Sequence, residues 1–180
     1  MKYLVLASGL TGSGKSEISR YIPELGSSCR ICPEEMRDNE FGYIHMKTPG
    51  TKAAFKNYIT KLARGRAFSA LLEGKNVVID SDAPTNKRRH ELLDGFGSKD
   101  TEKYLVILEA SPETRIQRVI GRKGQYGERM TPEEVKAHVY KDMFNWEEPA
   151  GPEGVEIIRY RNEIQEDLEM IKSDLDRRFG

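Results

Sequence analysis

The chain has 180 residues, of which 37% are hydrophobic and 32% charged, and its 29 Lys and Arg balance 29 Asp and Glu. This length suits one domain with a substantial core, and a net charge of zero argues against a protein that coats nucleic acid non-specifically, because such proteins carry a basic excess. No stretch is as apolar and long as a membrane span, and the start has no signal-peptide pattern, so we expect a cytoplasmic protein without a membrane partner.

The first predicted element is a short buried strand over residues 3–7, followed by GLTGSGKS at residues 9–16 and a predicted helix over 17–22. This motif is a complete phosphate-binding P-loop. Glycines let several backbone N–H groups point at one phosphate chain, and the helix N-terminus adds its positive dipole. Lys15 would reach the β and γ phosphates and the Ser16 hydroxyl would ligate Mg²⁺. The alternative, an ordinary Gly/Ser turn, would match the motif by chance in about one chain in a hundred at background glycine frequencies.

Strands and helices alternate along the rest of the chain, which predicts an α/β fold: a mostly parallel sheet of about five strands with helices on both faces. Ser111-Pro112 and Thr131-Pro132 are typical helix starts. Further strands are expected over 28–32, 76–79, 103–109 and 155–159, and further helices over 51–72, 86–93, 112–122, 132–145 and 163–178.

We expect a single domain over residues 1–180, with a helical lid over about 115–145. The Gly-rich, charged stretch 123–130 resembles a mobile lid segment. The polar stretch 36–50 is predicted to be a loop that could line a substrate cleft.

A carboxylate and an arginine follow the second strand. Ligands of open parallel sheets collect at the carboxyl ends of the strands, where Glu34, Glu35 and Arg37 would lie. A carboxylate there could accept a proton from an attacking hydroxyl, and Arg37 could stabilise charge on a phosphoryl group. The alternative is an acidic first helical turn favoured by the helix dipole.

The strand over 76–79 runs into Asp80, with Asp82 two residues on. An apolar strand ending in Asp beside a P-loop is the usual Walker B arrangement, in which the Asp holds Mg²⁺ through water. A strand-ending Asp can also cap the next turn. We favour a functional carboxylate and leave open whether it serves metal or substrate.

Two basic clusters follow. Lys87, Arg88 and Arg89 fan across roughly 200° of a helix, so they cannot all face one ligand. Arg115, Arg118 and Arg122 share one helix face that leads into the Gly-rich stretch, and this single-sign stripe favours a phosphate clamp over a solvated face.

Other side chains of interest are interpreted as structural. Cys29 and Cys32 have no second ligand pair for zinc and are expected to be reduced residues of a buried strand. Trp146 is expected to close the end of the lid helix. Isolated from one another in the sequence, the three histidines are expected to be structural or exposed: His45, His90 and His138.

Together these stretches resemble the small P-loop kinases, and most closely the kinase domain of the bacteriophage-type polynucleotide 5′-hydroxyl kinase family. The resemblance runs over nearly the whole chain. Glu34 falls on the family's general base, where the family has Asp, and Arg37 falls on its transition-state arginine. Asp80-Ser81-Asp82 stands where the family has Asp-Thr-Asn, and Arg88-Arg89 on its Arg-Arg pair.

The lid also resembles that family. Arg118 and Arg122 fall on its phosphate-clamping arginines, and residues 131–143 resemble the helix after its lid. The same scaffold is similar to that of zeta-type toxins and seryl-tRNA kinases.

The resemblance implies an ATP-dependent, Mg²⁺-dependent kinase whose acceptor is the 5′-hydroxyl of a DNA or RNA end. A kinase of a small molecule, nucleotide or aminoacyl-tRNA is an alternative, as is a nucleotide-driven ATPase or switch without an acceptor. ATP is preferred because no Asn/Thr-Lys-x-Asp motif for reading guanine is present. The sequence gives no indication of a protein partner.

The site residues expected on this basis fall into four groups. They are catalytic Lys15, Glu34, Arg37 and Arg122; nucleotide-binding Gly12, Ser13, Gly14, Lys15, Ser16, Arg118 and Arg122; acceptor-binding Glu34, Arg37, Asp80, Asp82 and Arg88; and metal-binding Ser16 and Asp80.

Overall fold

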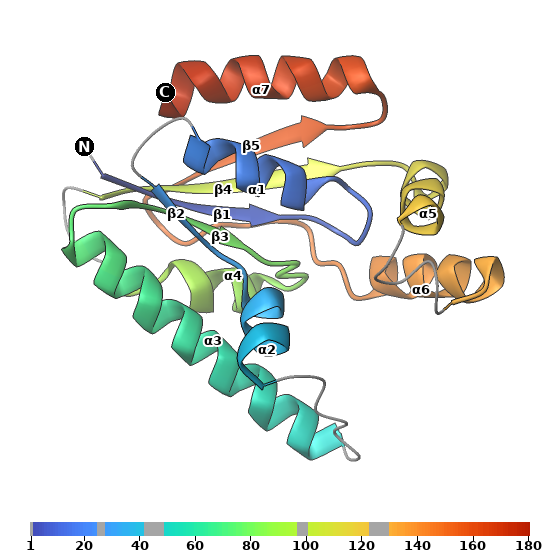
Figure 1. Ribbon diagram of the computed structural model, residues 1–180, viewed down its shortest axis with the longest axis horizontal. Helices are drawn as coiled ribbons and strands as arrows, with labels where there is room; N and C mark the ends of the chain where they lie inside the picture. Colours follow the sequence, from blue (N-terminus) through green and yellow to red (C-terminus); the bar gives the residue numbers. More distant parts are fainter. Residues whose placement is uncertain (1, 25–27, 42–48, 97–100, 123–129) are drawn as a thin grey trace.

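Five parallel strands form one sheet in the order β2-β3-β1-β4-β5 (Figure 1). The computed structural model describes residues 2–24, 28–41, 49–96, 101–122 and 130–180. The central strand β1 has no exposed area at residues 4–7, as expected for a strand of a parallel sheet covered on both faces. The strands are β1 Lys2–Ser8, β2 Ser28–Ile31, β3 Asn76–Asp80, β4 Thr101–Glu109 and β5 Val155–Arg161.

Helices cover both faces of the sheet and one end of it (Figure 1). α1 and α7 pack on one face, where Ile18, Leu168 and Leu175 join strand residues in a buried cluster. α3 and α4 cover the other face, through residues such as Ala63 and Leu92. α5 and α6 pack on each other beyond the carboxyl end of the strands. The helices are α1 Lys15–Glu24, α2 Pro33–Phe41, α3 Pro49–Leu72, α4 Asn86–Leu93, α5 Pro112–Gly121, α6 Pro132–Phe144 and α7 Gln165–Phe179.

These elements confirm the α/β fold, the five strands and the helices expected from the sequence. Thr85, Ser111 and Thr131 cap α4, α5 and α6 by accepting a backbone N–H with their hydroxyl oxygens. None of the helices that the structure describes is both long and apolar enough to traverse a membrane.

One prediction is wrong. The segment expected to be a polar loop from residue 36 is helical as far as Phe41, because α2 begins with acidic residues in its first turn and buries Met36 in the core. Residues 42–48 of that expected loop and residues 123–129 of the expected lid segment lie outside the described residues.

The parallel sheet brings three segments to one edge. β1 ends at the P-loop, β3 ends at Asp80, and β2 is followed by the first turn of α2 with Glu34. Ala7 and Asp80 are partners in the ladder between β1 and β3, and Ser81 N donates to Ala7 O at 3.1 Å. The sequence-predicted site residues from these segments therefore converge.

Candidate functional site

The P-loop adopts a backbone that only glycine accommodates at two positions. Gly12 and Gly14 have φ of +86° and +96°, a region that residues with a side chain rarely enter. A Cβ on Gly12 would stand 2.7 Å from the Arg115 carbonyl oxygen, and one on Gly14 would overlap the Asn162 amide. The two glycines therefore permit both the loop conformation and the close approach of α5 and β5.

Side chains from α5 and from the end of β5 hold the outside of this loop. Arg115 is 1% exposed and donates through Nε to Thr11 O at 2.9 Å and through Nη2 to Val139 O at 3.3 Å. Arg115 therefore does not belong to a phosphate clamp, and the prediction that grouped it with Arg118 and Arg122 in such a clamp is wrong. Through these two hydrogen bonds, Arg115 links the P-loop to α6. Burial lowers the pKa of Arg115.

Arg118 and Asn162 complete this support. Arg118 Nη1 donates to Asn162 O at 2.9 Å and to Gly12 O at 3.4 Å. Asn162 Nδ2 donates to Ser13 O at 2.8 Å. Sequence reasoning missed Asn162, since nothing near it forms a motif. The expectation that Arg118 contacts nucleotide phosphates stays a prediction.

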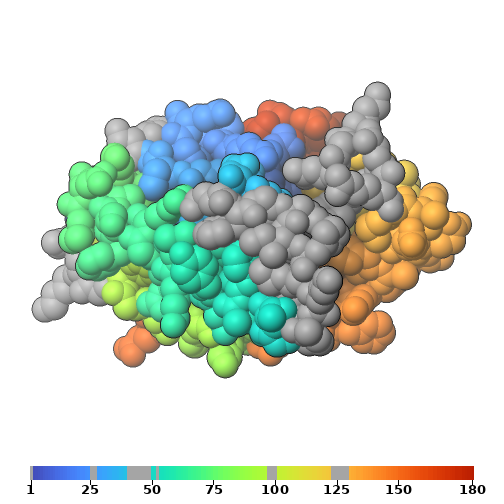
Figure 2. Space-filling view, turned by 60° about the horizontal axis from the view of Figure 1, so that its bottom comes forward, coloured from blue at the N-terminus to red at the C-terminus, as the bar shows by residue number. Residues whose placement is uncertain are grey.

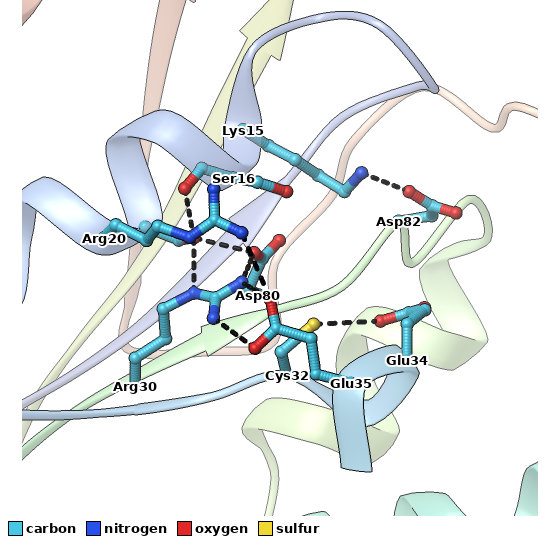
Figure 3. A network of polar contacts seen from close by, with 10 residues as sticks. Lys15, Ser16, Arg20, Arg30, Cys32, Glu34, Glu35, Asp80 and Asp82 are labelled. Carbon is cyan, nitrogen blue, oxygen red and sulfur yellow. Dashed lines mark hydrogen bonds and ion pairs between the residues drawn. The ribbon is translucent and has the colours of Figure 1, made fainter. Parts of the chain in front are cut away.

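Lys15 faces two carboxylates across the site (Figure 3). Its Nζ forms an ion pair with Asp82 Oδ1 at 2.5 Å. Burial alone would lower the pKa of Lys15, but the charges of Asp82 and Asp80 outweigh it and the pKa is raised. Lys15 is therefore charged at neutral pH.

Glu34 lies beside this pair, at the start of α2. Its pKa is raised, first by burial and then by the negative charge of Asp82, while Lys15 acts in the opposite direction. Cys32 Sγ donates to Glu34 Oε2 at 3.6 Å. A carboxyl group with a raised pKa next to the P-loop lysine is suited to proton transfer at the position of a transferred phosphoryl group.

Glu35 is held elsewhere. Arg30 makes a bidentate contact with it, at 2.7 Å through Nη1 and 3.0 Å through Nη2, and Arg20 adds a contact at 3.2 Å. The hydrogen bonds from Arg30 lower the pKa of Glu35. Of the two adjacent glutamates, Glu35 is held by arginines, whereas Glu34 is close enough to Lys15 for the lysine charge to lower its pKa. The role of Glu34 as the general base stays a prediction.

Asp80 and Ser16 lie together beneath the loop. Ser19 Oγ donates to Asp80 Oδ2 at 2.7 Å and is 3.2 Å from Ser16 O, and Arg30 Nη2 also contacts Asp80 Oδ2. A hydroxyl and a carboxylate are oxygen donors of the kind that Mg²⁺ prefers, so these residues fit the metal. Asp80 Oδ2 already accepts from two donors, which favours a water-mediated role for Asp80.

Sequence reasoning missed Arg30 and Ser19. The sequence did contain a signal for Arg30, which is a charged residue within a short strand of the sheet. Such a residue is buried only when it has charged or hydrogen-bonding partners, so its position indicates an ion pair. The guanidinium links β2 to β3 and α2, and the pKa of Arg30 is raised, with its contacts to Glu35 and Asp80 outweighing burial.

The other predicted arginines lie on three different helices. Arg37 on α2 donates through Nε to Asp38 at 2.7 Å, and Arg122 is the partly exposed C-cap of α5. Arg88 on α4 is 9% exposed; its Nη1 contacts Glu91 at 3.2 Å and its buried Nε has no hydrogen-bond partner in the described structure. These three roles stay predictions.

Arg89 and Trp146 are structural. Arg89 is fully buried, donates to Pro84 O and Glu147 O, and lies 4.5 Å from the centre of the Trp146 ring. Trp146 follows the last turn of α6 and packs on the core, so it closes the end of that helix as predicted.

The cysteines match expectation only in part, and two of the histidines match it. Cys29 and Cys32 are free thiols, but both are only partly buried and Cys32 follows β2 instead of lying in it. Burial raises the pKa of Cys32 to about 12. His90 and His138 are partly exposed; His90 lies 4.0 Å from Asp94, the C-cap of α4, and His138 lies 3.6 Å from Asp142 of α6. His45 lies outside the described residues. Over the described ranges, no cluster of three His, Cys, Asp or Glu could hold a metal ion.

Solved structures of kinases share this fold. A candidate kinase from Chloroflexus aurantiacus J-10-fl is 14% identical, with a TM-score of 0.72 over 98% of this chain and 95% of that chain. Shikimate kinase from Bacteroides thetaiotaomicron is 16% identical, with a TM-score of 0.58 over 98% and 95%. A chain of the Pnkp1/Rnl/Hen1 RNA repair complex is 23% identical, with a TM-score of 0.57 over 80% of this chain and 45% of that chain.

No curated protein matches the chain. A family model does. It is described as an AAA domain and covers residues 4–149, from β1 through the P-loop to the segment after α6. With more than half of its 180 residues matched, the chain belongs to the AAA domain family and has the fold of P-loop kinases.

Proposed function

We propose that the protein is a Mg²⁺-dependent kinase that transfers the γ-phosphate of ATP to a hydroxyl group, with the 5′-hydroxyl of a DNA or RNA end as its acceptor. The observation that carries the proposal is the placement of Glu34 and Asp82 beside Lys15. A nucleotide-driven switch does not need a proton-accepting carboxylate at the position of the γ-phosphate, whereas a kinase does.

Each group of site residues has a separate role in the proposed reaction. The P-loop amides and Lys15 hold the β and γ phosphates, and Ser16 and Asp80 would hold Mg²⁺, which neutralises charge on the phosphates when bound. Ionised Glu34 takes the proton of the acceptor hydroxyl while the oxygen of that hydroxyl bonds to the γ-phosphorus. The bond from that phosphorus to the bridging oxygen breaks, and ADP keeps the electron pair.

The arginines support phosphoryl charge in this proposal. Arg37 and Arg122 would contact the transferring group, as in the kinases that the sequence resembles. Arg88 has a buried Nε without a partner in the described structure, and an anionic acceptor would supply one. A cytoplasmic location goes with the proposal, and the free thiols of Cys29 and Cys32 support it.

A small molecule, nucleotide or aminoacyl-tRNA is the second candidate acceptor. The net charge of zero favours it, since a polynucleotide kinase has phosphates to bind along the strand. Similarity of fold to shikimate kinase is compatible with it as well.

A transfer assay with γ-labelled ATP tests the proposal. Oligonucleotides of DNA and RNA with a 5′-hydroxyl, nucleosides, tRNA and small hydroxy acids are compared side by side, with Lys15→Ala as the control for contaminating kinases. We expect label on the oligonucleotides. Label on a small acceptor alone would make the second candidate correct. ATP hydrolysis without transfer to any acceptor would contradict the kinase proposal.

A further inference from the structure

The positive charge of α3 is not balanced by acidic residues of the same helix, although the chain as a whole is electrically neutral. α3 contains Lys and Arg at five positions and no acidic residue in its 24 residues, whereas the adjacent α2 has four acidic residues and one basic residue. A solvated helix usually mixes both signs along its surface. The basic positions of α3 are Lys52, Lys56, Lys61, Arg64 and Arg66.

Two of these basic side chains border an open groove on the outward face of α3. The groove has a volume of about 500 Å³ and is lined by Lys61 and Arg66 together with small residues such as Gly65 and Ser69. Glu73 lies at one end of the groove and is paired with Lys75 at 2.7 Å. Lys56, Lys61 and Arg66 are exposed. A Cβ placed on Gly65 would meet no atom within 4 Å, so a ligand can approach the backbone there.

Aromatic rings lie on the same stripe as the groove. Tyr58, Lys61, Gly65 and Phe68 follow one another at i, i+3, i+7 and i+10, which places them on one face of the helix. Tyr58 is 52% exposed and Phe68 50% exposed. A lysine between two exposed rings, next to a groove with a second basic side chain, combines a charge for phosphate with surfaces on which unpaired bases stack.

We infer that the outward face of α3, defined by Tyr58, Lys61, Gly65, Arg66 and Phe68, binds a single-stranded nucleic acid. The charge identifies a polyanion, and the rings favour unpaired bases over a duplex, whose bases are already stacked. The apolar surface is broken by lysine and glycine, which argues against a lipid surface, because an interfacial helix presents a continuous apolar face.

The position of α3 connects this surface to the candidate site. α2 and α3 pack together and lie side by side on the face shown in Figure 2, and α2 carries Glu34. The 24 residues of α3 span about 36 Å. This step rests on the proposed function: a strand whose 5′ end lies at Glu34 would continue over α3, away from the reaction centre.

Binding is measured with a probe that cannot be phosphorylated, so that it does not depend on catalysis. Fluorescence anisotropy follows a labelled 12-nucleotide single strand that already carries a 5′-phosphate, titrated with the full chain at several salt concentrations. The test variants are the double variant Lys61→Glu/Arg66→Glu, whose two side chains line the groove, and the single variant Phe68→Ala. Lys136→Glu is the matched control, because Lys136 is an exposed lysine of α6.

The double variant is expected to bind at least tenfold more weakly. The slope of log K against log salt should fall by about 1.4, because Lys61 and Arg66 each neutralise one phosphate and each neutralised phosphate of a single strand adds about 0.7 to the slope. Phe68→Ala should weaken binding roughly 5-fold to 150-fold, since one base no longer stacks. Lys136→Glu should bind as the unchanged chain does. Equal binding by all four proteins would overturn the inference.

Self-association and transfer activity separate the inference from its alternatives. If sedimentation shows that the unchanged chain self-associates and that Phe68→Ala abolishes this without changing strand binding, α3 binds a second copy and the inference is wrong. If the strand binds through α3 but its 5′-hydroxyl form accepts no phosphate, the inference holds and the proposed acceptor fails. If transfer to a nucleoside occurs but no strand binds, the kinase proposal survives and the inference fails.

Discussion

Lys15 is the side chain on which phosphate chemistry at this site depends. Its charge neutralises the negative charge that grows between the β and γ phosphates, so it acts mainly in the transition state. Lys15→Ala should therefore lower kcat by several orders of magnitude while the thermal midpoint stays within a few degrees. Lys87→Ala, which removes an exposed lysine of α4, is the control and should keep full activity. Near-normal turnover in Lys15→Ala would remove the kinase assignment.

The negative charge of Asp82 should influence the pH at which Glu34 ionises. Because burial and Asp82 raise the pKa of Glu34, kcat should rise with pH through a value above that of an ordinary glutamate, as the base ionises. Asp82→Asn removes the repelling charge and should move this rise to lower pH. Glu34→Gln should abolish it and lower kcat about a hundredfold to ten-thousandfold.

Glu35→Gln is the control for this experiment. Glu35 is held by Arg30 and Arg20 and should affect kcat much less than Glu34 does. A severe loss in Glu35→Gln with a mild one in Glu34→Gln would assign the base to the other glutamate. Unchanged pH dependence in Asp82→Asn would show that the two carboxylates are not coupled.

Stability provides a second measurement on Glu34. A carboxyl whose pKa is higher in the folded state than in the unfolded state favours folding at low pH, and this contribution is lost as pH rises from the unfolded pKa through the folded pKa. Glu34, with its raised pKa, therefore makes folding less favourable above the pKa of an ordinary glutamate. Glu34→Gln should be more stable than the unchanged chain at pH 7 and gain less at pH 4, as measured by thermal unfolding.

At the scale of elements, α5 supports the P-loop with two arginines that should respond differently to substitution. Arg115 is buried with two backbone acceptors, and Arg115→Met would leave the Thr11 and Val139 carbonyls without these donors. An unsatisfied buried polar group costs about 1–3 kcal/mol, so this variant should unfold at a clearly lower denaturant concentration. Arg118→Lys should change stability less than Arg115→Met does, because Arg118 is less buried. It should change the KM for ATP more, because the lysine ammonium cannot replace the two-pronged contact of a guanidinium with phosphate.

Urea unfolding and steady-state kinetics of both variants check this difference. Exposed Arg161→Lys, at the end of β5, is the control for each measurement. If Arg118→Lys leaves the KM for ATP unchanged, the predicted phosphate-clamping role of Arg118 is wrong and its role is limited to the loop backbone. If Arg115→Met is as stable as the unchanged chain, the buried contacts contribute no net stability.

At the scale of the whole molecule, nucleotide binding should stabilise the fold through the P-loop. A ligand at a hundred times its Kd adds about 2.7 kcal/mol, and for a chain of this length that corresponds to an increase in Tm of roughly 5–11 °C. Mg²⁺ with a non-hydrolysable ATP analogue should therefore raise Tm by this amount. Gly14→Ala should lose the increase, because the added Cβ overlaps Asn162 and displaces the loop.

Gly154→Ala separates this effect from backbone strain. Gly154 has φ of +75° and no atom within 4 Å of an added Cβ, so the substitution brings a comparable conformational cost without a collision. Its Tm without ligand should fall, and the increase on adding nucleotide should remain. An increase of the normal size in Gly14→Ala would contradict the assignment of the nucleotide to this loop.

The sequence by itself determined the P-loop, the alternation of strands and helices and the helix caps, because each is encoded by contiguous residues. Glycines at fixed spacing decide the backbone at 12 and 14, and apolar runs decide the strands. The spacing to Arg37 singled out Glu34 as the candidate base, and that role stays a prediction.

Only the tertiary structure decided which of these residues share a partner. The contact of Arg30 with Asp80 joins residues 50 apart in the chain, that of Arg115 with Thr11 joins residues 104 apart, and that of Asn162 with Ser13 joins residues 149 apart. No local pattern predicts such pairs. They depend on the order of strands in the sheet, which brings the ends of β1, β2, β3 and β5 and the start of α5 to one edge, where burial then requires each charged or polar group to find a partner.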